Sequence, residues 1–130
     1  MLILTIRTDK PEAEIGLYDG SERLAYDSWL AHRQLAETIH RHISALLASR
    51  DKELHDIEGI VCFQGPGSFT GLRIGLSVAN ALSYSLGASI VACEGDEWLE
   101  AGLKRLLAGE STELALPEYG ALPHITAQKK

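Results

Sequence analysis

The stretch that decides the fold reads Gln64-Gly65-Pro66-Gly67-Ser68-Phe69-Thr70-Gly71-Leu72-Arg73-Ile74-Gly75. It joins an apolar run typical of a buried strand to a run with helical periodicity, through a glycine-rich turn that we call the glycine loop (residues 65–71). The N-terminus of a helix exposes unpaired N–H groups and the positive end of a dipole, so such a junction can bind an anion. Phosphate or nucleotide binding is therefore the first function to test against the spacing.

The spacing of the glycine loop does not fit the known phosphate-binding motifs. A Walker loop has four residues before its Gly-Lys-Ser/Thr ending, whereas five separate Gly65 from Gly71, and Leu72 stands in the lysine position. The three glycines also leave one residue too many for the G-x-G-x-x-G fingerprint, and Ser68 lacks the flanking glycines of a nucleophile elbow. The pattern favours a tight strand-to-helix turn with Ser68 or Thr70 as N-cap, and phosphate or nucleotide binding by the loop stays as the alternative.

Length and composition limit the other possibilities. The 130 residues suffice for one domain with a sizeable core, and a net charge of −6 argues against direct nucleic-acid binding by its body. No apolar run is long enough to span a membrane, and the first residues lack the basic flank of a signal peptide, so we expect a cytoplasmic protein without membrane contact. Cys62 and Cys93 are expected to be small buried residues in a reducing compartment.

Hydrophobic periodicity predicts elements in the order β-β-β-α-β-α-β-α. Strands are expected at residues 2–8, 13–18, 24–29, 57–63 and 89–92, and helices at about 31–50, 70–86 and 96–107. Asp96 is expected to cap the third helix, and Gly87 and Gly109 to end the second and third. This order predicts an α/β fold with a mixed five-stranded sheet, a single ribonuclease-H-like lobe of the kind that actin-like ATPases duplicate. Residues 1–108 are expected to form the lobe and residues 109–130 an extended tail.

The second predicted helix carries a stripe of small residues at every fourth position: Gly71, Gly75, Ala79 and Ser83. A glycine inside a helix costs about 1 kcal/mol relative to alanine, so another element is expected to approach the stripe closely. The helix is apolar nearly all round, which predicts burial on all sides. Burial within the same chain and contact with a helix of another subunit both fit this pattern. The second is favoured because a small lobe has few layers.

The run from Phe63 to Gly75, followed by the small-residue helix, resembles the G-P-G-S-F-T-G-L-R-I-G hallmark of the TsaB (YeaZ) family. The order of elements up to about Leu107 also resembles the first lobe of that family. The resemblance implies a non-catalytic subunit that pairs with TsaD, and works with the ATPase TsaE, in the synthesis of threonylcarbamoyladenosine in bacterial tRNA. Because the chain is acidic and a cleft between two lobes is expected to be absent, contact with tRNA is expected to be indirect at most.

In the resemblance, the first two helices carry the contact with TsaD. We therefore expect a partner interface on these helices, and a homodimer through the same helices stays open. The residues expected at the interface are Gly71, Leu72, Gly75, Leu76, Ala79, Ser83, His32, Leu35 and Ile39. A bulky side chain at Gly75 or Ala79 is expected to abolish pairing and to leave the lobe folded.

The sequence departs from the family pattern in ways that bear on catalysis. Arg7-Thr8-Asp9 stands where the family has Asp-Thr-Ser, so Arg7 replaces a carboxylate that could hold a metal or a phosphate. The second lobe is expected to be absent, and with it the cleft that would enclose ATP. The first strand has no acidic residue for a nuclease, and the histidines lack the spacing of zinc ligands. No catalytic residue, cofactor or metal is expected.

Overall fold

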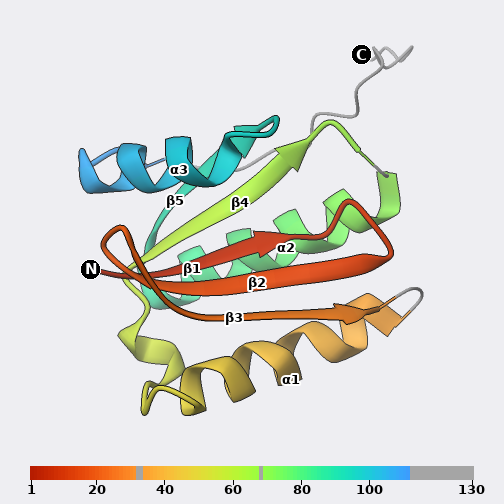
Figure 1. Ribbon diagram of the computed structural model, residues 1–130, viewed down its shortest axis with the longest axis horizontal. Coiled ribbons are helices and arrows are strands. Elements are labelled where there is room, and N and C mark those ends of the chain that lie inside the picture. The colour runs from red at the N-terminus through yellow and green to blue at the C-terminus, as the bar shows by residue number, and fades with distance from the viewer. Residues whose placement is uncertain (32–33, 68, 112–130) are drawn as a thin grey trace.

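A five-stranded mixed sheet with helices on both faces makes up the chain (Figure 1). The computed structural model describes residues 1–31, 34–67 and 69–111. Its elements are β1 (Leu2–Arg7), β2 (Glu12–Asp19), β3 (Glu22–Leu30), α1 (Leu35–Ala48), a short 3-10 helix (Leu54–Asp56), β4 (Gly59–Gly65), α2 (Phe69–Leu86), β5 (Ser89–Glu94) and α3 (Trp98–Leu107). The predicted order of strands and α-helices is confirmed.

The strands lie in the order β3-β2-β1-β4-β5, so the first strand is central. β1 pairs antiparallel with β2 and parallel with β4, while β3 and β5 form the two edges. Short connections make the antiparallel half possible, whereas the parallel half needs helical crossovers. The result is the single mixed lobe that the sequence predicts.

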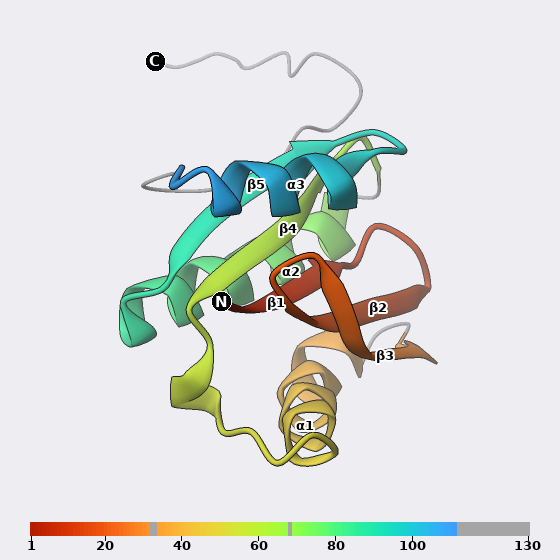
Figure 2. The same ribbon diagram turned by 60° about the vertical axis from the view of Figure 1, so that its left-hand side comes forward.

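The helices divide between the faces of the sheet, with α1 and α2 on one face and α3 on the other (Figures 1 and 2). Because side chains alternate along a strand, β1 contributes to both cores. Leu4 and Ile6 pack with residues of α1 and α2, whereas Ile3 belongs to the cluster of Trp98 and Leu103 from α3. Each face thus buries its own apolar core.

The ends of the helices only partly follow the sequence predictions. Gly87 and Gly109 follow α2 and α3 with φ of 68° and 89°, the left-handed conformation that a terminating glycine allows, so both predictions are confirmed. Asp96 is not the cap of α3, because Glu97 takes the N-cap position and makes no side-chain capping bond. Thr70 lies inside α2 and is therefore not its N-cap, while Ser68 lies outside the described residues.

The segment after α3 returns to the outer edge of β5. The backbone N–H of Ile90 donates to the hydroxyl of Ser111 (3.1 Å), and an Nη1–H of Arg105 donates to the carbonyl oxygen of Ala92 (3.0 Å). Glu110 accepts a hydrogen bond from Nε of the same arginine (3.0 Å). These contacts fix the chain up to residue 111. The remainder of the expected tail lies outside the described residues.

Candidate functional site

The small-residue stripe of α2 lies against the end of β1. Gly75 and Ala79 are buried, and a Cβ built on Gly75 would overlap the hydroxyl oxygen of Thr8. A Cβ on Gly71 would overlap the carbonyl oxygen of the same threonine. The stripe is therefore approached by Thr8, the residue that directly follows β1 in the same lobe. The close approach at Gly71 and Gly75 thus comes from the same chain, whereas contact of the helix with another subunit stays a prediction.

Most of the other predicted interface residues also lie beneath the surface. Four of them are buried by the chain's own core: Leu72, Leu76, Leu35 and Ile39. Ser83 is half-buried and its hydroxyl donates to the carbonyl oxygen of Ala88 (2.6 Å), while His32 lies outside the described residues. A bulky residue at Gly75 or Ala79 would disturb the lobe itself, contrary to the expectation that the lobe would stay intact.

The outer side of the same two helices holds a groove of about 410 Å³ where α1 meets α2. Its lining comes from both helices: Ala36, His40, Thr70, Arg73, Ile74, Ser77 and Val78. Ile74 is half-buried and Val78 is buried, so they form an apolar floor, while Ala36 and Ser77 are small and exposed. A groove with an apolar floor and small residues in its lining suits a helix that packs at close range.

His42 anchors α1 to the edge strand β3. Its ring stacks on the ring of Trp29, with centroids 3.8 Å apart and planes 4° from parallel, and its Nδ1 lies 2.7 Å from Oδ2 of Asp27. The indole N–H of Trp29 donates to the hydroxyl of Thr38 (3.0 Å), which donates to the carbonyl oxygen of Gln34 (2.8 Å). Sequence reasoning missed this cluster, because alternation gives the face of a strand residue but not its partner on a helix.

The glycine loop faces a carboxylate. Arg7 lies over the ring of Phe63, 4.0 Å from its centroid, and donates to Asp9 from Nε (2.8 Å) and Nη2 (3.2 Å). The side chain of Asp9 is 8% exposed and would contact a Cβ on Gly67. The hydrogen bond to Asp9 raises the pKa of Arg7, so the guanidinium is charged and already paired. A phosphate at the loop would therefore meet a carboxylate and find no free cation in Arg7.

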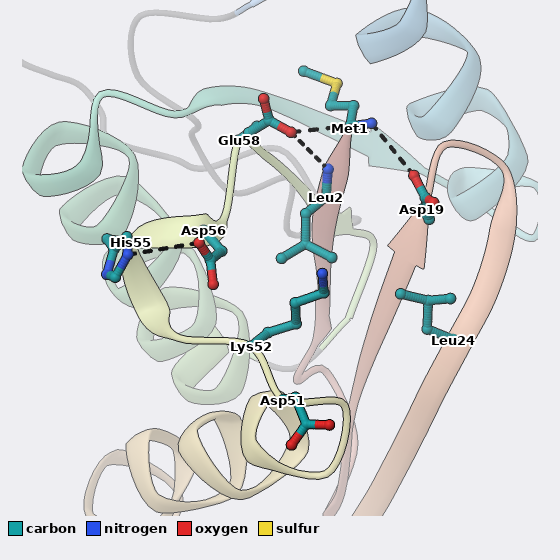
Figure 3. Close-up of a pocket in the computed structure, with 9 residues that line it drawn as sticks. All are labelled: Met1, Leu2, Asp19, Leu24, Asp51, Lys52, His55, Asp56 and Glu58. Carbon is teal, nitrogen blue, oxygen red and sulfur yellow. Dashed lines mark hydrogen bonds and ion pairs between the residues drawn. The ribbon is translucent and has the colours of Figure 1, made fainter.

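Another cavity, of about 500 Å³, lies at the opposite end of the sheet (Figure 3). The terminal amine of Met1 lies 3.4 Å from Oδ1 of Asp19 and 4.0 Å from Oε1 of Glu58, which also accepts the N–H of Leu2 (3.0 Å). These two carboxylates are thus engaged with the start of β1. Among the described residues, no group of three or more histidine, cysteine, aspartate or glutamate side chains is placed to hold a metal ion.

Comparison with known proteins decides the family. Residues 29–99, more than half of the chain, match the family model described as "TsaD: tRNA N6-adenosine threonylcarbamoyltransferase". The Escherichia coli tRNA threonylcarbamoyladenosine biosynthesis protein TsaB is 30% identical over 115 residues, which are 83% of this chain and 49% of that protein. The chain belongs to the TsaB (YeaZ) family. The resemblance seen in the glycine loop is thereby confirmed.

Other members of the wider group are similar over shorter shares of their length. The tRNA N6-adenosine threonylcarbamoyltransferase of Geotalea uraniireducens is 32% identical over 99 residues, 74% of this TsaB-family chain and 28% of that protein. YeaZ from Pseudomonas aeruginosa shares the fold, with a TM-score of 0.66 and 24% identity over 72% of this chain and 43% of that chain. The chain therefore spans at most about half the length of these relatives.

The matched stretch contains the whole groove. Residues 29–99 include α1, the glycine loop and α2, from which all lining residues of the groove come. Among the described helices, none combines the length and the hydropathy that crossing a membrane requires. The groove on the outer face of α1 and α2 therefore lies within the stretch that matches the family model.

Proposed function

We propose that this TsaB-family chain is a non-catalytic subunit in the synthesis of threonylcarbamoyladenosine in tRNA. It pairs with a TsaD-like protein through the outer face of α1 and α2. The observation that carries the proposal is the groove between these helices, with its apolar floor of Ile74 and Val78 inside the family-matched stretch. The names of the relatives support the pathway, since they include both a threonylcarbamoyladenosine biosynthesis protein and the transferase.

The non-catalytic part of the proposal is supported by contacts at the carboxyl end of the parallel strands, where an open α/β fold usually binds its ligand. The N–H of Gly95 donates to the carbonyl oxygen of Gly65 (3.1 Å), so the last residue of β4 is joined there to the segment after β5. Arg7 and Asp9 pair beside them, and the guanidinium is stacked on an aromatic ring. These contacts also count against the alternative of a phosphate- or nucleotide-binding protein that uses the glycine loop.

The family resemblance implies further components of the complex besides the TsaD-like protein. A TsaE-like ATPase is the further partner, and it meets this chain within the complex with the TsaD-like protein. The net charge of −6 makes the chain a poor binder of the tRNA backbone, so tRNA contacts belong to other subunits. Calorimetry with ATP, ADP and phosphate should show no heat of binding to the isolated chain.

A matched pair of substitutions tests the docking face. Ala36 is exposed in α1 at the groove, and Ala101 is exposed in α3 on the opposite face of the sheet. Ala36→Arg should abolish co-purification with the TsaD-like protein, because the long charged side chain blocks the groove, and Ala101→Arg should leave it unchanged. Both variants should keep the urea midpoint of the wild type. Full-strength co-purification of Ala36→Arg would show that this face is not the contact.

A further inference from the structure

The groove between α1 and α2 carries one positive charge, that of Arg73, although the chain is acidic as a whole. Arg73 of α2 and His40 of α1 line it, and both are exposed. The residues that line the groove include no aspartate or glutamate. Neither Arg73 nor His40 forms an ion pair with another of the described residues. The strongest charge at the groove therefore has no partner within the described part of the chain.

The charged residues of α1 and α2 together also give a net positive charge. α2 contains no acidic residue, and α1 contains one, Glu37, against Arg41 on the same helix and Arg73 on α2. The chain as a whole has a net charge of −6, but this surface is positive. Its local electric field attracts negatively charged partners and repels positively charged ones. The charge of this face is thus opposite to that of the chain around it.

From this contrast we infer that the groove receives a helix of a different chain with an acidic flank. That helix places an apolar side chain on the floor of Ile74 and Val78 and one or more carboxylates against Arg73 and His40. This inference rests on the proposed pairing through α1 and α2. A guanidinium loses its bound water when it is buried at an interface. A carboxylate that accepts hydrogen bonds from its N–H groups compensates for this loss, whereas an unpaired guanidinium destabilises the complex.

The same charges disfavour a second copy of this chain as the occupant. A two-fold dimer presents identical surfaces to each other, so the groove of one copy would meet α1 or α2 of the other. α2 brings Arg73 and no carboxylate, and α1 brings Glu37 accompanied by Arg41. Like charges therefore face each other across the two-fold axis, and the partner with acidic side chains is preferred.

Charge reversal at Arg73 tests the inference. The dissociation constant for the TsaD-like protein is measured for the wild type, Arg73→Glu and Arg73→Lys at low and at high ionic strength. Arg73→Glu should weaken binding by about tenfold or more, while Arg73→Lys should keep most of the affinity. Salt should weaken the wild-type complex more than that of Arg73→Glu. Arg23→Glu, the same change at an exposed position of β3, is the control and should bind like the wild type.

The outcomes separate this inference from the proposed function. If Ala36→Arg abolishes pairing but Arg73→Glu binds like the wild type, the face is correct and the acidic partner helix is overturned. If neither substitution changes the affinity, the docking face fails and the inference fails with it. Sedimentation of wild type mixed with Arg73→Glu completes the test. A dimer that forms more strongly in the mixture than in either protein alone would show that a second copy fills the groove.

Discussion

The hydroxyl of Thr8 donates a hydrogen bond of 2.7 Å to the carbonyl oxygen of Gly71. Thr8 follows the central strand β1, and Gly71 lies in the first turn of α2, so the bond joins the middle of the sheet to a helix of the proposed partner face. The approach is possible because Gly71 and Gly75 have no Cβ to meet the threonine. The position of α2 is therefore set from beneath by β1.

Gly75→Ala should destabilise the lobe. The added Cβ would overlap the hydroxyl oxygen of Thr8 and lie 3.2 Å from its Cβ and Cγ2, so strand and helix must move apart. We expect a loss of about 2 kcal/mol in the free energy of unfolding, despite the helix propensity of alanine. Urea unfolding measures it. In a Thr8→Ala background the loss should be smaller, because the two sites are coupled. Wild-type stability of Gly75→Ala would contradict the close approach.

His42→Ala should loosen α1 from β3. The substitution removes the ring stacked on Trp29 and the contact with Asp27, and we expect the free energy of unfolding to fall by about 1 to 2 kcal/mol. Tryptophan fluorescence of the folded protein should change as well. His40→Ala removes an exposed histidine from the same helix and is the control, with an expected change below about 0.5 kcal/mol. Equal effects of the two substitutions would rule out the anchoring role.

Cys62 should make the chain less stable in alkali. Burial raises the pKa of its thiol above the ordinary value of 9.0, so the folded chain keeps a proton that the unfolded chain releases. The free energy of unfolding should therefore fall as the pH rises above 9.0, by about 1.4 kcal/mol per pH unit from this group. Urea unfolding of wild type and Cys62→Ala at several alkaline pH values measures the difference. Parallel curves for the two proteins would exclude this origin.

The order of the elements could be predicted because each one has a clear period. The alternation in residues 13–18 and the helical spacing in residues 35–47 are local signals, and the crossover rule then places the parallel strands. The boundary at Asp96 could not be predicted, because Asp96 and Glu97 are adjacent acidic residues and either could stand at the N-cap. Local sequence therefore determines the type of an element better than its first residue.

The contacts of the candidate site were harder to predict than the helices that carry it. The stripe from Gly71 to Ser83 indicates a close approach, but a helical period identifies a face of the helix and not the element opposite to it. Thr8, which makes that approach, is separated from Gly71 by 63 positions in the chain. The groove residues Ala36 and Ser77 carried no signal of their own, since small exposed residues have no distinctive pattern.

The bonds at the outer edge of β5 have a consequence for how copies of this chain meet. The unpaired amides and carbonyls of an edge strand are a template for a strand of another molecule, and such pairing leads to aggregation. Here an incoming strand would have to displace the hydroxyl of Ser111 and the guanidinium of Arg105, which Glu110 holds in place. At this edge the segment after α3 therefore protects the chain against strand-by-strand polymerisation.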